Sequence, residues 1–384
     1  MSSDPRVLQS DYMHFAKFGA GARYSLATSG VKDCVLADLR LSLDDLALHG
    51  PNAGGYGPLI DKVAARFGVD PACVVMPGGG CSFSNHLAFA ALVAPGDEVL
   101  IEDPTYELLR STLGYLRADV RTFERRPDEA WALDPERVAA AIGPRTRLVV
   151  LNNPLNPSAT VSSEDDLALL ADFCVRHDAV VICDEVWEHV VFNGHVHRPL
   201  IALPGMRERC VKIGSAGKMF ALTGWKVGFI CAAPPLTSVI AKAHQFLTFT
   251  TPPNLQAAVA WGLDNSEAWF AAMPGALAAS RDRLTEALLR EGFEVLPSHG
   301  TYFLNVDLRA SGIDEDDMAF CLRAVKEAGV AAIPISAFYE EAPVTHLIRL
   351  CFPKRDATLD EGARRLAKAR ELSLANSTSE TAPA

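Results

Sequence analysis

Short apolar runs rich in valine, isoleucine and leucine alternate with amphipathic stretches over the first two thirds of the chain, and this alternation limits its fold most strongly. Such runs are typical of a mostly parallel sheet covered by helices. Strands are expected at 73–77, 98–102, 119–123, 147–152, 179–184, 210–214 and 227–232. Helices are expected between them at 58–68, 83–93, 105–116, 163–177 and 236–247. The sequence therefore predicts an α/β fold.

The pattern changes after Pro252 and Pro253, where long helical stretches are followed by short strands. Helices are expected at 255–263, 276–291, 315–328 and 357–371, and strands near 293–296, 301–306 and 346–351. This arrangement predicts a second, α+β unit. The last residues, LANSTSETAPA, are small and polar, so we expect a disordered tail over 372–384.

Composition narrows the class of protein. A chain of 384 residues with 49% hydrophobic content can bury one or two large cores, and a net charge of −11 offers no basic surface to nucleic acid. The nine cysteines include no CxxC pair, which is typical of a reducing compartment rather than of disulfides or a zinc site. We find neither a signal peptide nor a membrane-spanning run, so we expect a cytoplasmic protein without a metal centre.

The segment KIGSAGKMFALTGWKVGF at 212–229 passes from a predicted strand into a loop of small residues that presents Lys218. Ligands of parallel α/β sheets bind at the carboxyl ends of the strands. The small residues before the lysine would let a bulky ring come close to the backbone, as a lysine that forms a Schiff base requires. The competing interpretation is a surface loop that happens to contain a lysine.

Asp184 ends the apolar run AVVIC, in a strand expected to be buried on both faces. An unpaired carboxylate there would cost several kcal/mol, so it should face a cation. A protonated pyridine nitrogen is such a cation, and an aspartate that keeps it charged makes pyridoxal 5′-phosphate (PLP) an electron sink. The alternative is an aspartate that caps the turn after the strand.

Two other turns follow predicted strands. LNNPLNPSATV at 151–161 contains Asn156, whose amide could reach the phenolic oxygen of such a cofactor, although the bare motif is only a turn. MPGGGCSFSNHLAF at 76–89 places glycines before a helix start, where free N–H groups and the helix dipole favour a phosphate. The Lys-Ser/Thr pair of a nucleotide P-loop is absent. All four motifs can meet at one edge of one sheet.

With these motifs, residues 54–370 resemble the class I/II aminotransferases of the fold-type I PLP enzymes, and SAGKMFALTGWKVGF is close to a signature of that family. NPSATV, HQFLTFTTP, GTYFLNVD, GVAAIPISAF and LIRLCFPK are similar to the methionine/kynurenine aminotransferase subgroup. The resemblance implies a large PLP-binding domain over 46–275 with a seven-stranded sheet. It also implies a small domain over 276–371 that the N-terminal arm, 1–45, helps to build.

Site roles follow from the matching motifs. Lys218 matches the Schiff-base lysine, Asp184 the partner of the pyridine nitrogen, and Asn156 the asparagine at the ring oxygen. Tyr106 matches the aromatic that stacks on the ring, a contact worth about 0.5–1.5 kcal/mol, with a core aromatic as the alternative. The positions that match the phosphate site are Gly80, Cys81, Ser82, Ser215 and Lys226.

Arg349, in the apolar run HLIRLCF, matches the arginine that binds the substrate α-carboxylate. A guanidinium suits that role because bidentate pairing fixes orientation as well as charge. A structural salt bridge is the alternative. The resemblance also implies substrate contacts from Asn156, Ser29 and Gly30.

The chain departs from the family in two places. The family's DEVY reads DEVW, so Trp187 replaces a tyrosine that touches the cofactor's ring oxygen, and an indole N–H can donate but cannot accept or ionise. YSLATSGV at 24–31 replaces the usual GxPDF-like segment. The tyrosine that reaches the partner subunit's phosphate falls at Gly50, with His49 and Tyr56 as nearby alternatives.

The resemblance implies an aminotransferase that moves an amino group from an α-amino acid to a 2-oxo acid by ping-pong chemistry, in a homodimer with shared active sites. Aromatic, sulfur-containing or aliphatic donors are favoured, because no extra basic residue matches a pocket position. Two alternatives stay open. A cysteine-S-conjugate β-lyase would use the same carbanion, whereas a non-catalytic regulator would need a DNA-binding module, for which too little chain precedes the first sheet motif.

Overall fold

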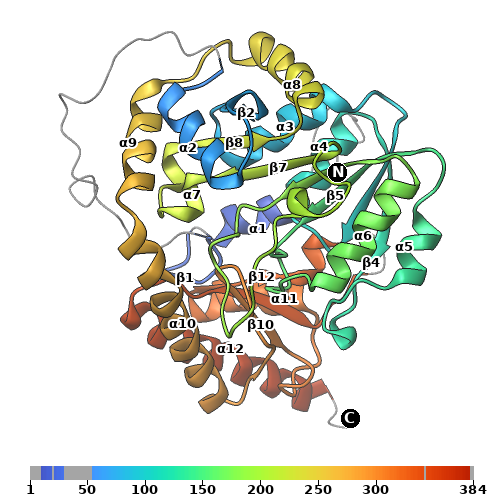
Figure 1. Ribbon diagram of the computed structural model, residues 1–384. Helices are drawn as coiled ribbons and strands as arrows, with labels where there is room; N and C mark the ends of the chain where they lie inside the picture. The colour runs from blue at the N-terminus through green and yellow to red at the C-terminus, as the bar shows by residue number, and fades with distance from the viewer. Residues whose placement is uncertain (1–9, 20, 30–53, 341–342, 381–384) are drawn as a thin grey trace.

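A computed structural model describes residues 10–19, 21–29, 54–340 and 343–380 (Figure 1). It contains a seven-stranded sheet flanked by helices, and below it in Figure 1 a smaller part built on a four-stranded sheet. The fold class predicted from the sequence is therefore confirmed. None of the helices in the described ranges combines the length and the hydropathy that a membrane span needs.

All seven strands expected for the large sheet are present. They are β2 (Val74–Val75), β3 (Glu98–Asp103), β4 (Asp119–Glu124), β5 (Thr146–Asn152), β6 (Val180–Asp184), β7 (Cys210–Ser215) and β8 (Gly228–Cys231). Their order across the sheet is β2-β8-β7-β6-β5-β3-β4. Only β8 runs antiparallel to its neighbours, so β5, β6 and β7 end at the same edge.

Helices cover both faces of this sheet. They are α2 (Gly57–Phe67), α3 (Gly80–Leu92), α4 (Glu107–Tyr115), α5 (Pro135–Ala141), α6 (Glu164–Arg176), α7 (Ala216–Met219), α8 (Pro234–Leu247) and α9 (Pro253–Asp264). Alternate strand residues face opposite ways: Val150 and Ile182 pack with the α3 side, and Val149 and Val181 with the α6 side. Both faces are apolar, which explains the continuous apolar runs in the sequence.

The start of α6 carries a side-chain cap, and the helices absent from the sequence prediction are α1 (Asp11–Gly19), α5 and α7. Ser163 and Asp166 form a capping box at the start of α6. The sequence prediction missed α5, whose seven residues are too few to show a clear apolar period. Its start signal was nonetheless present, because the Asp134 side chain accepts hydrogen bonds from the N–H groups of Glu136 and Arg137.

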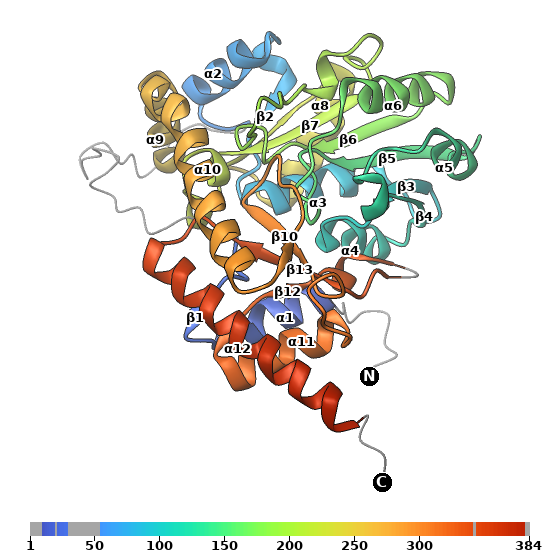
Figure 2. The ribbon, with the colours of Figure 1, turned by 90° about the horizontal axis from the view of Figure 1, so that it is seen from below.

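The smaller part combines segments from both ends of the chain. Its strands are β1 (Tyr24–Ser25), β9 (Glu294–Val295), β10 (Phe303–Asp307), β11 (Val330–Ala331), β12 (Ile333–Pro334) and β13 (Leu347–Cys351), and its helices are α1 (Asp11–Gly19), α10 (Glu267–Arg290), α11 (Asp317–Arg323) and α12 (Asp356–Glu380). β1 pairs in parallel with β11, and α1 contacts β12. In Figure 2 the blue N-terminal elements accordingly lie among the orange and red ones.

Two details differ from the sequence prediction. α12 continues to Glu380, so regular structure replaces the expected disordered tail over 372–380. Ser373, two residues past the expected end of this helix, is buried, so the packed face of the helix continues into the segment. α10 runs unbroken across the proposed domain boundary at 275–276, so one helix joins the two parts. The boundary at 45 lies outside the described residues.

Candidate active site

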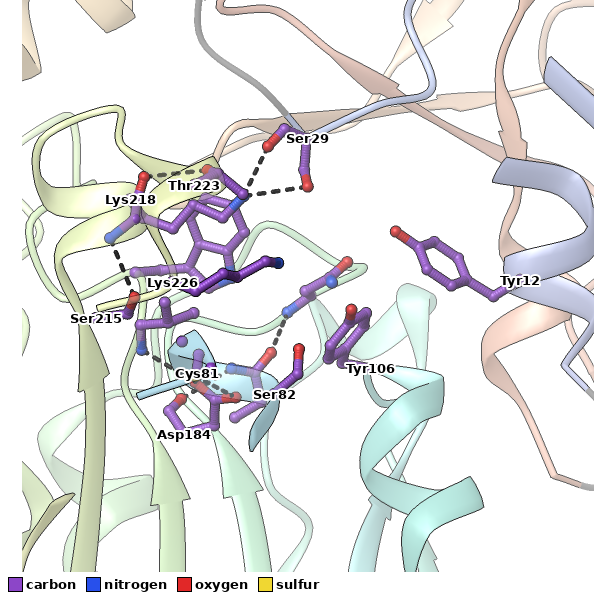
Figure 3. A pocket seen from close by; sticks show the side chains of 17 residues that line it. Tyr12, Ser29, Cys81, Ser82, Tyr106, Asp184, Ser215, Lys218, Thr223 and Lys226 are labelled. Carbon is purple, nitrogen blue, oxygen red and sulfur yellow. Dashed lines mark hydrogen bonds between the residues drawn. The ribbon is translucent and has the colours of Figure 1, made fainter. Parts of the chain in front are cut away.

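A cavity with about 740 Å³ of empty space opens where β5, β6 and β7 end (Figure 3). Asn152, Asp184 and Ser215 are the last residues of these three strands, and all three line it. Parallel strands bring their carboxyl ends together, which is why motifs far apart in the sequence meet here. The predicted site residues that line the cavity are Ser29, Gly80, Cys81, Ser82, Tyr106, Asn156, Asp184, Trp187, Ser215, Lys218 and Lys226.

Five of the residues considered in the sequence analysis do not appear among the lining residues. Gly30 lies outside the described part of the chain, as do His49 and Gly50. Arg349 is fully buried and lies one contact away from the cavity, where its Nη1 donates to Asn156 Oδ1 at 2.6 Å. Tyr56 precedes α2 and its backbone N–H is bound by Gln256.

Lys218 stands on the short helix α7, immediately after β7. Its Nζ donates to the backbone oxygen of Ser29 at 2.6 Å and to the hydroxyl oxygen of Ser29 at 3.1 Å. The amine also lies 4.8 Å from the ring centre of Trp187. Burial lowers the pKa of Lys218 from 10.5 to about 8, so the neutral, nucleophilic form of the amine is reached at a lower pH than for an exposed lysine.

Asp184 lies on the opposite side of the cavity from Lys218, next to Cys81 (Figure 3). Its side chain accepts hydrogen bonds from Asn85 Nδ2 at 2.7 Å and from the Val186 N–H at 3.1 Å. Burial raises the pKa of Asp184, and the hydrogen bonds from its neighbours oppose that rise. A charged carboxylate at this position would be stabilised by a nearby cation.

Asn156 connects the cavity to Arg349. Its backbone N–H donates to Asn152 Oδ1 at 2.9 Å, and Asn152 Nδ2 in turn donates to the Asp184 carbonyl at 2.8 Å. The Asn156 amide oxygen accepts from Arg349, so its Nδ2 is the group that can point into the cavity.

Arg349 is a buried cation whose contacts are mostly aromatic. Its guanidinium carbon lies 3.9 Å from the ring centre of Phe303 and 5.4 Å from that of Tyr12. It forms no ion pair with any described carboxylate, and its Nε has no hydrogen-bond partner among the described residues. This arrangement does not fit a structural salt bridge, and it leaves a positive charge in need of an anion.

The amino end of α3 forms one end of the cavity. Its N-cap, Gly79, provides no side-chain hydrogen bond, so the N–H groups that follow Gly80 in the first turn can bind an anion. Gly80 has φ 71° and its N–H donates to the Lys226 carbonyl at 2.7 Å. A Cβ on Gly228 would come within 2.7 Å of the Gly80 backbone, so glycine is needed where the helix meets β8. The Ser215 hydroxyl is used locally, donating to the Val227 carbonyl at 3.0 Å.

Aromatic side chains form the rest of the wall. Tyr106 precedes α4 and packs edge-on against Tyr12, with ring centres 5.7 Å apart. Trp187 is buried and packs edge-on against Tyr302, with ring centres 4.9 Å apart. The Tyr302 hydroxyl donates to the Lys218 carbonyl at 2.8 Å, which fixes the backbone that carries the lysine.

The sequence prediction missed several residues of the site: Tyr12, Asn85, Asn152, Thr223 and Tyr302. Asn152 could have been found, because it is a polar residue at the end of an apolar strand, like Asp184. Tyr12 could not, because nothing in its local sequence shows that α1 packs beside Arg349.

A separate buried cluster, Glu185, Glu188 and His197, has side chains of the metal-binding kind. Lys212 donates to both glutamates and lies 2.9 Å from Glu188 Oε2. Because an ammonium group already compensates the two carboxylates, we assign this cluster to the packing of β6 against β7.

Comparisons with known proteins agree with this geometry. The family model described as aminotransferase class I and II matches residues 17–366. A probable N-succinyldiaminopimelate aminotransferase of Mycobacterium tuberculosis is 41% identical over 332 residues, covering 82% of this chain and 83% of the relative. The methionine aminotransferase of Escherichia coli is 40% identical over 287 residues, covering 75% of this chain and 74% of the relative.

A kynurenine–oxoglutarate transaminase 1 of Rattus norvegicus is 34% identical over 357 residues, covering 83% of this chain and 84% of the relative. The solved N-succinyldiaminopimelate aminotransferase structure from Mycobacterium tuberculosis matches with a TM-score of 0.89 and 37% identity, over 94% of this chain and 97% of that one. The resemblance to the methionine/kynurenine subgroup is thereby confirmed.

Proposed function

We propose that this chain transfers amino groups from an α-amino acid to a 2-oxo acid at the cavity around Lys218. The premise is that the chain belongs to the class I and II aminotransferase family and is a PLP-dependent transaminase. The observation that carries the proposal is that one cavity has an amine of lowered pKa on one side and a buried aspartate on the other.

The residues around the cavity have the chemical groups that PLP needs, at positions where they could bind it. A helix start without a side-chain cap suits the phosphate, Asp184 suits the ring nitrogen, and the Asn156 amide suits the ring oxygen. Tyr106 can lie against a ring face. When bound, PLP supplies an aldehyde that condenses with amines and a ring that takes up the electron pair released at Cα.

We assign two roles to Lys218, as the covalent attachment point of the cofactor and as the base that moves the Cα proton. Both roles need a neutral amine, and burial supplies it. Ser29 accepts two hydrogen bonds from the Lys218 Nζ, one at its backbone oxygen and one at its hydroxyl. Trp187 closes the adjacent wall where the family has a tyrosine, so it contributes bulk and no ionisable hydroxyl.

Reconstitution with PLP is expected to depend on pH through Lys218. Because only the neutral amine attacks an aldehyde, the rate for the apoprotein should rise with pH and be half-maximal near pH 8, the lowered pKa of Lys218. The measurement is stopped-flow absorbance at a fixed PLP concentration. The same measurement with N-α-acetyl-lysine in place of the protein shows how much of the pH dependence comes from the titration of PLP itself. A rate that still rises steeply towards pH 10 would contradict a lowered pKa.

We propose that Arg349 binds the α-carboxylate of the substrate. It is a buried cation without a described carboxylate partner, and its Nη2 makes only a weak 3.4 Å hydrogen bond to the Ala27 carbonyl. A substrate carboxylate can replace that contact and pair with the guanidinium through two hydrogen bonds. Since Asn156 bridges Arg349 and the cavity, the bound carboxylate would lie beside the cofactor ring.

The aromatic wall favours an aromatic, sulfur-containing or aliphatic donor. Tyr12, Tyr106 and Trp187 line the cavity, and the only cationic side chains among its described lining residues are Lys218 and Lys226. A distal carboxylate therefore has no arginine beside it in the described cavity. The names of the relatives are consistent with donors of varied size.

A donor panel tests this proposal. The PLP-loaded protein is mixed with single amino acids, and loss of its visible absorbance is followed without any 2-oxo acid. Methionine, phenylalanine, leucine and kynurenine are expected to react at least about tenfold faster than aspartate, since each added hydrophobic contact is worth about 1–3 kcal/mol. Faster reaction with aspartate would contradict the proposed donor class, and no reaction with any amino acid would contradict the function.

We further propose a cytoplasmic homodimer with shared active sites. Phe246 and Phe249, at the end of α8 and just after it, are 90% and 72% exposed, and Leu247 between them is half exposed. An exposed apolar group of this kind supports a protein interface. The comparisons give no support to the β-lyase alternative, and the family assignment to an active enzyme disfavours the regulator.

A further inference from the structure

The carboxylate of Asp184 is held by three neighbours. The Val186 N–H binds Oδ1 at 3.1 Å, Asn85 Nδ2 binds Oδ2 at 2.7 Å, and the Cys81 thiol lies 3.1 and 3.2 Å from the two oxygens. Asn85 makes the shortest of these contacts. Each carboxylate oxygen therefore has its own N–H donor, which fixes the plane of the group.

Asn85 lies on the second turn of α3 and is 3% exposed. It is not among the residues that line the cavity, so it can act on a ligand only through the lining residues that it contacts, Asp184 and Cys81. Its Nδ2 also lies 3.2 Å from the Cys81 carbonyl, one turn earlier in the helix. This second contact orients the amide, so that its other hydrogen points at the carboxylate.

Stability does not explain an asparagine at this position. The Asn85 Oδ1 is buried and has no hydrogen-bond partner among the described residues, which destabilises the fold. The neighbouring positions Leu87, Ala88 and Phe89 are fully buried and apolar, so a leucine would suit the surroundings better. What the asparagine contributes is its contact with Asp184.

We propose that Asn85 is a positioning residue that holds the Asp184 carboxylate towards the ring nitrogen of the cofactor and favours its ionised form. This inference rests on the proposed role of Asp184. Burial raises the pKa of Asp184, and a hydrogen bond to the charged form opposes that effect, as those of Cys81, Val186 and Asn85 do. Without Asn85, the carboxylate would turn more freely and take up a proton more readily.

Binding to the apoprotein of Asn85→Leu tests the inference without measuring turnover. Two ligands are compared, PLP and its deaza analogue, in which the ring nitrogen is replaced by C–H. The dissociation constant for PLP is expected to rise about tenfold or more, the effect of one hydrogen bond to a charged group. The constant for the analogue should stay the same or fall, because the analogue offers the carboxylate no N–H.

The controls separate this inference from the proposed function. Ser84→Ala removes another buried polar group of α3, whose hydroxyl donates to the Gly80 carbonyl, and should leave both constants unchanged. Asp184→Asn should abolish the preference of the wild-type protein for PLP over the analogue. In the Asp184→Asn variant, adding Asn85→Leu should change the dissociation constant for PLP less than about twofold, because the contact between the carboxylate and the ring nitrogen is already lost.

Equal loss of affinity for PLP and for the analogue in Asn85→Leu would overturn the inference, since it would mean that Asn85 only packs. Unchanged PLP binding would overturn it too. Failure of the proposed function looks different, because the wild-type protein would then not prefer PLP and Asp184→Asn would have no effect. If Asn85→Leu does not fold, as judged by circular dichroism, Asn85→Ala is measured with the same expectation.

Discussion

Replacing Lys218 by alanine is expected to abolish transamination and to remove the visible absorbance of the protein-bound cofactor. The Lys218 amine, beside Ser29 and Trp187, is proposed to join an aldehyde covalently and then to carry the Cα proton. Loss of the proton-transfer role alone is worth about 10²–10⁴-fold in rate. Single-turnover kinetics with the best donor of the panel, together with an absorbance spectrum, measure both effects.

The matched control is Lys242→Ala, which removes an exposed lysine on α8. It should leave both the spectrum and the turnover unchanged. An added primary amine such as methylamine can restore part of the lost proton transfer in Lys218→Ala if the lysine acts as the base. Full activity in Lys218→Ala would refute the chemistry proposed for this cavity.

Replacing Arg349 by glutamine is expected to lower kcat/KM for amino acids by about 10²–10³-fold, because one partner of a buried, hydrogen-bonded charge pair is worth about 2–5 kcal/mol. The loss should appear mainly as a higher KM. The absorbance of the bound cofactor should persist, since Arg349 reaches the cavity only through Asn156.

A substrate amine that lacks the α-carboxylate distinguishes a loss of carboxylate binding from other effects of Arg349→Gln. The rate of its half-reaction should be nearly the same in Arg349→Gln and in the wild-type protein, because such an amine has no carboxylate for the guanidinium to bind. Arg309→Gln, which changes an exposed arginine after β10, serves as the control and should alter neither rate. An unchanged KM for amino acids in Arg349→Gln would show that the arginine has no part in substrate binding.

The large sheet could be predicted because its strands are buried on both faces and therefore apolar throughout. Val149 and Val150 face opposite layers, yet both are fully buried, so the run is visible in the sequence. β1 and β11 could not be predicted, because each has two residues and exists only through pairing with the other. Such a pair depends on contacts between residues about 300 positions apart, and local patterns do not contain them.

The same reasoning explains which site residues were found. Asp184 and Lys218 follow strands, and the parallel topology alone brings strand ends together. Asn85 and Tyr12 lie within helices, where a polar or aromatic residue gives no sign of what packs against it. Their roles follow from tertiary contacts, so only a structure reveals them. The roles of the motif residues themselves stay predictions until the variants above are measured.

The joint construction of the smaller part from both chain ends has a consequence for when the protein becomes active. Lys218 and Asp184 belong to the middle of the chain, whereas Ser29 and Tyr12 precede them and Arg349 follows them. A chain that stops short of β13 would possess the lysine and the aspartate but would lack Arg349, the residue proposed to bind the substrate carboxylate. We therefore expect amino-acid binding to begin only after β13 has been made and has paired with β10.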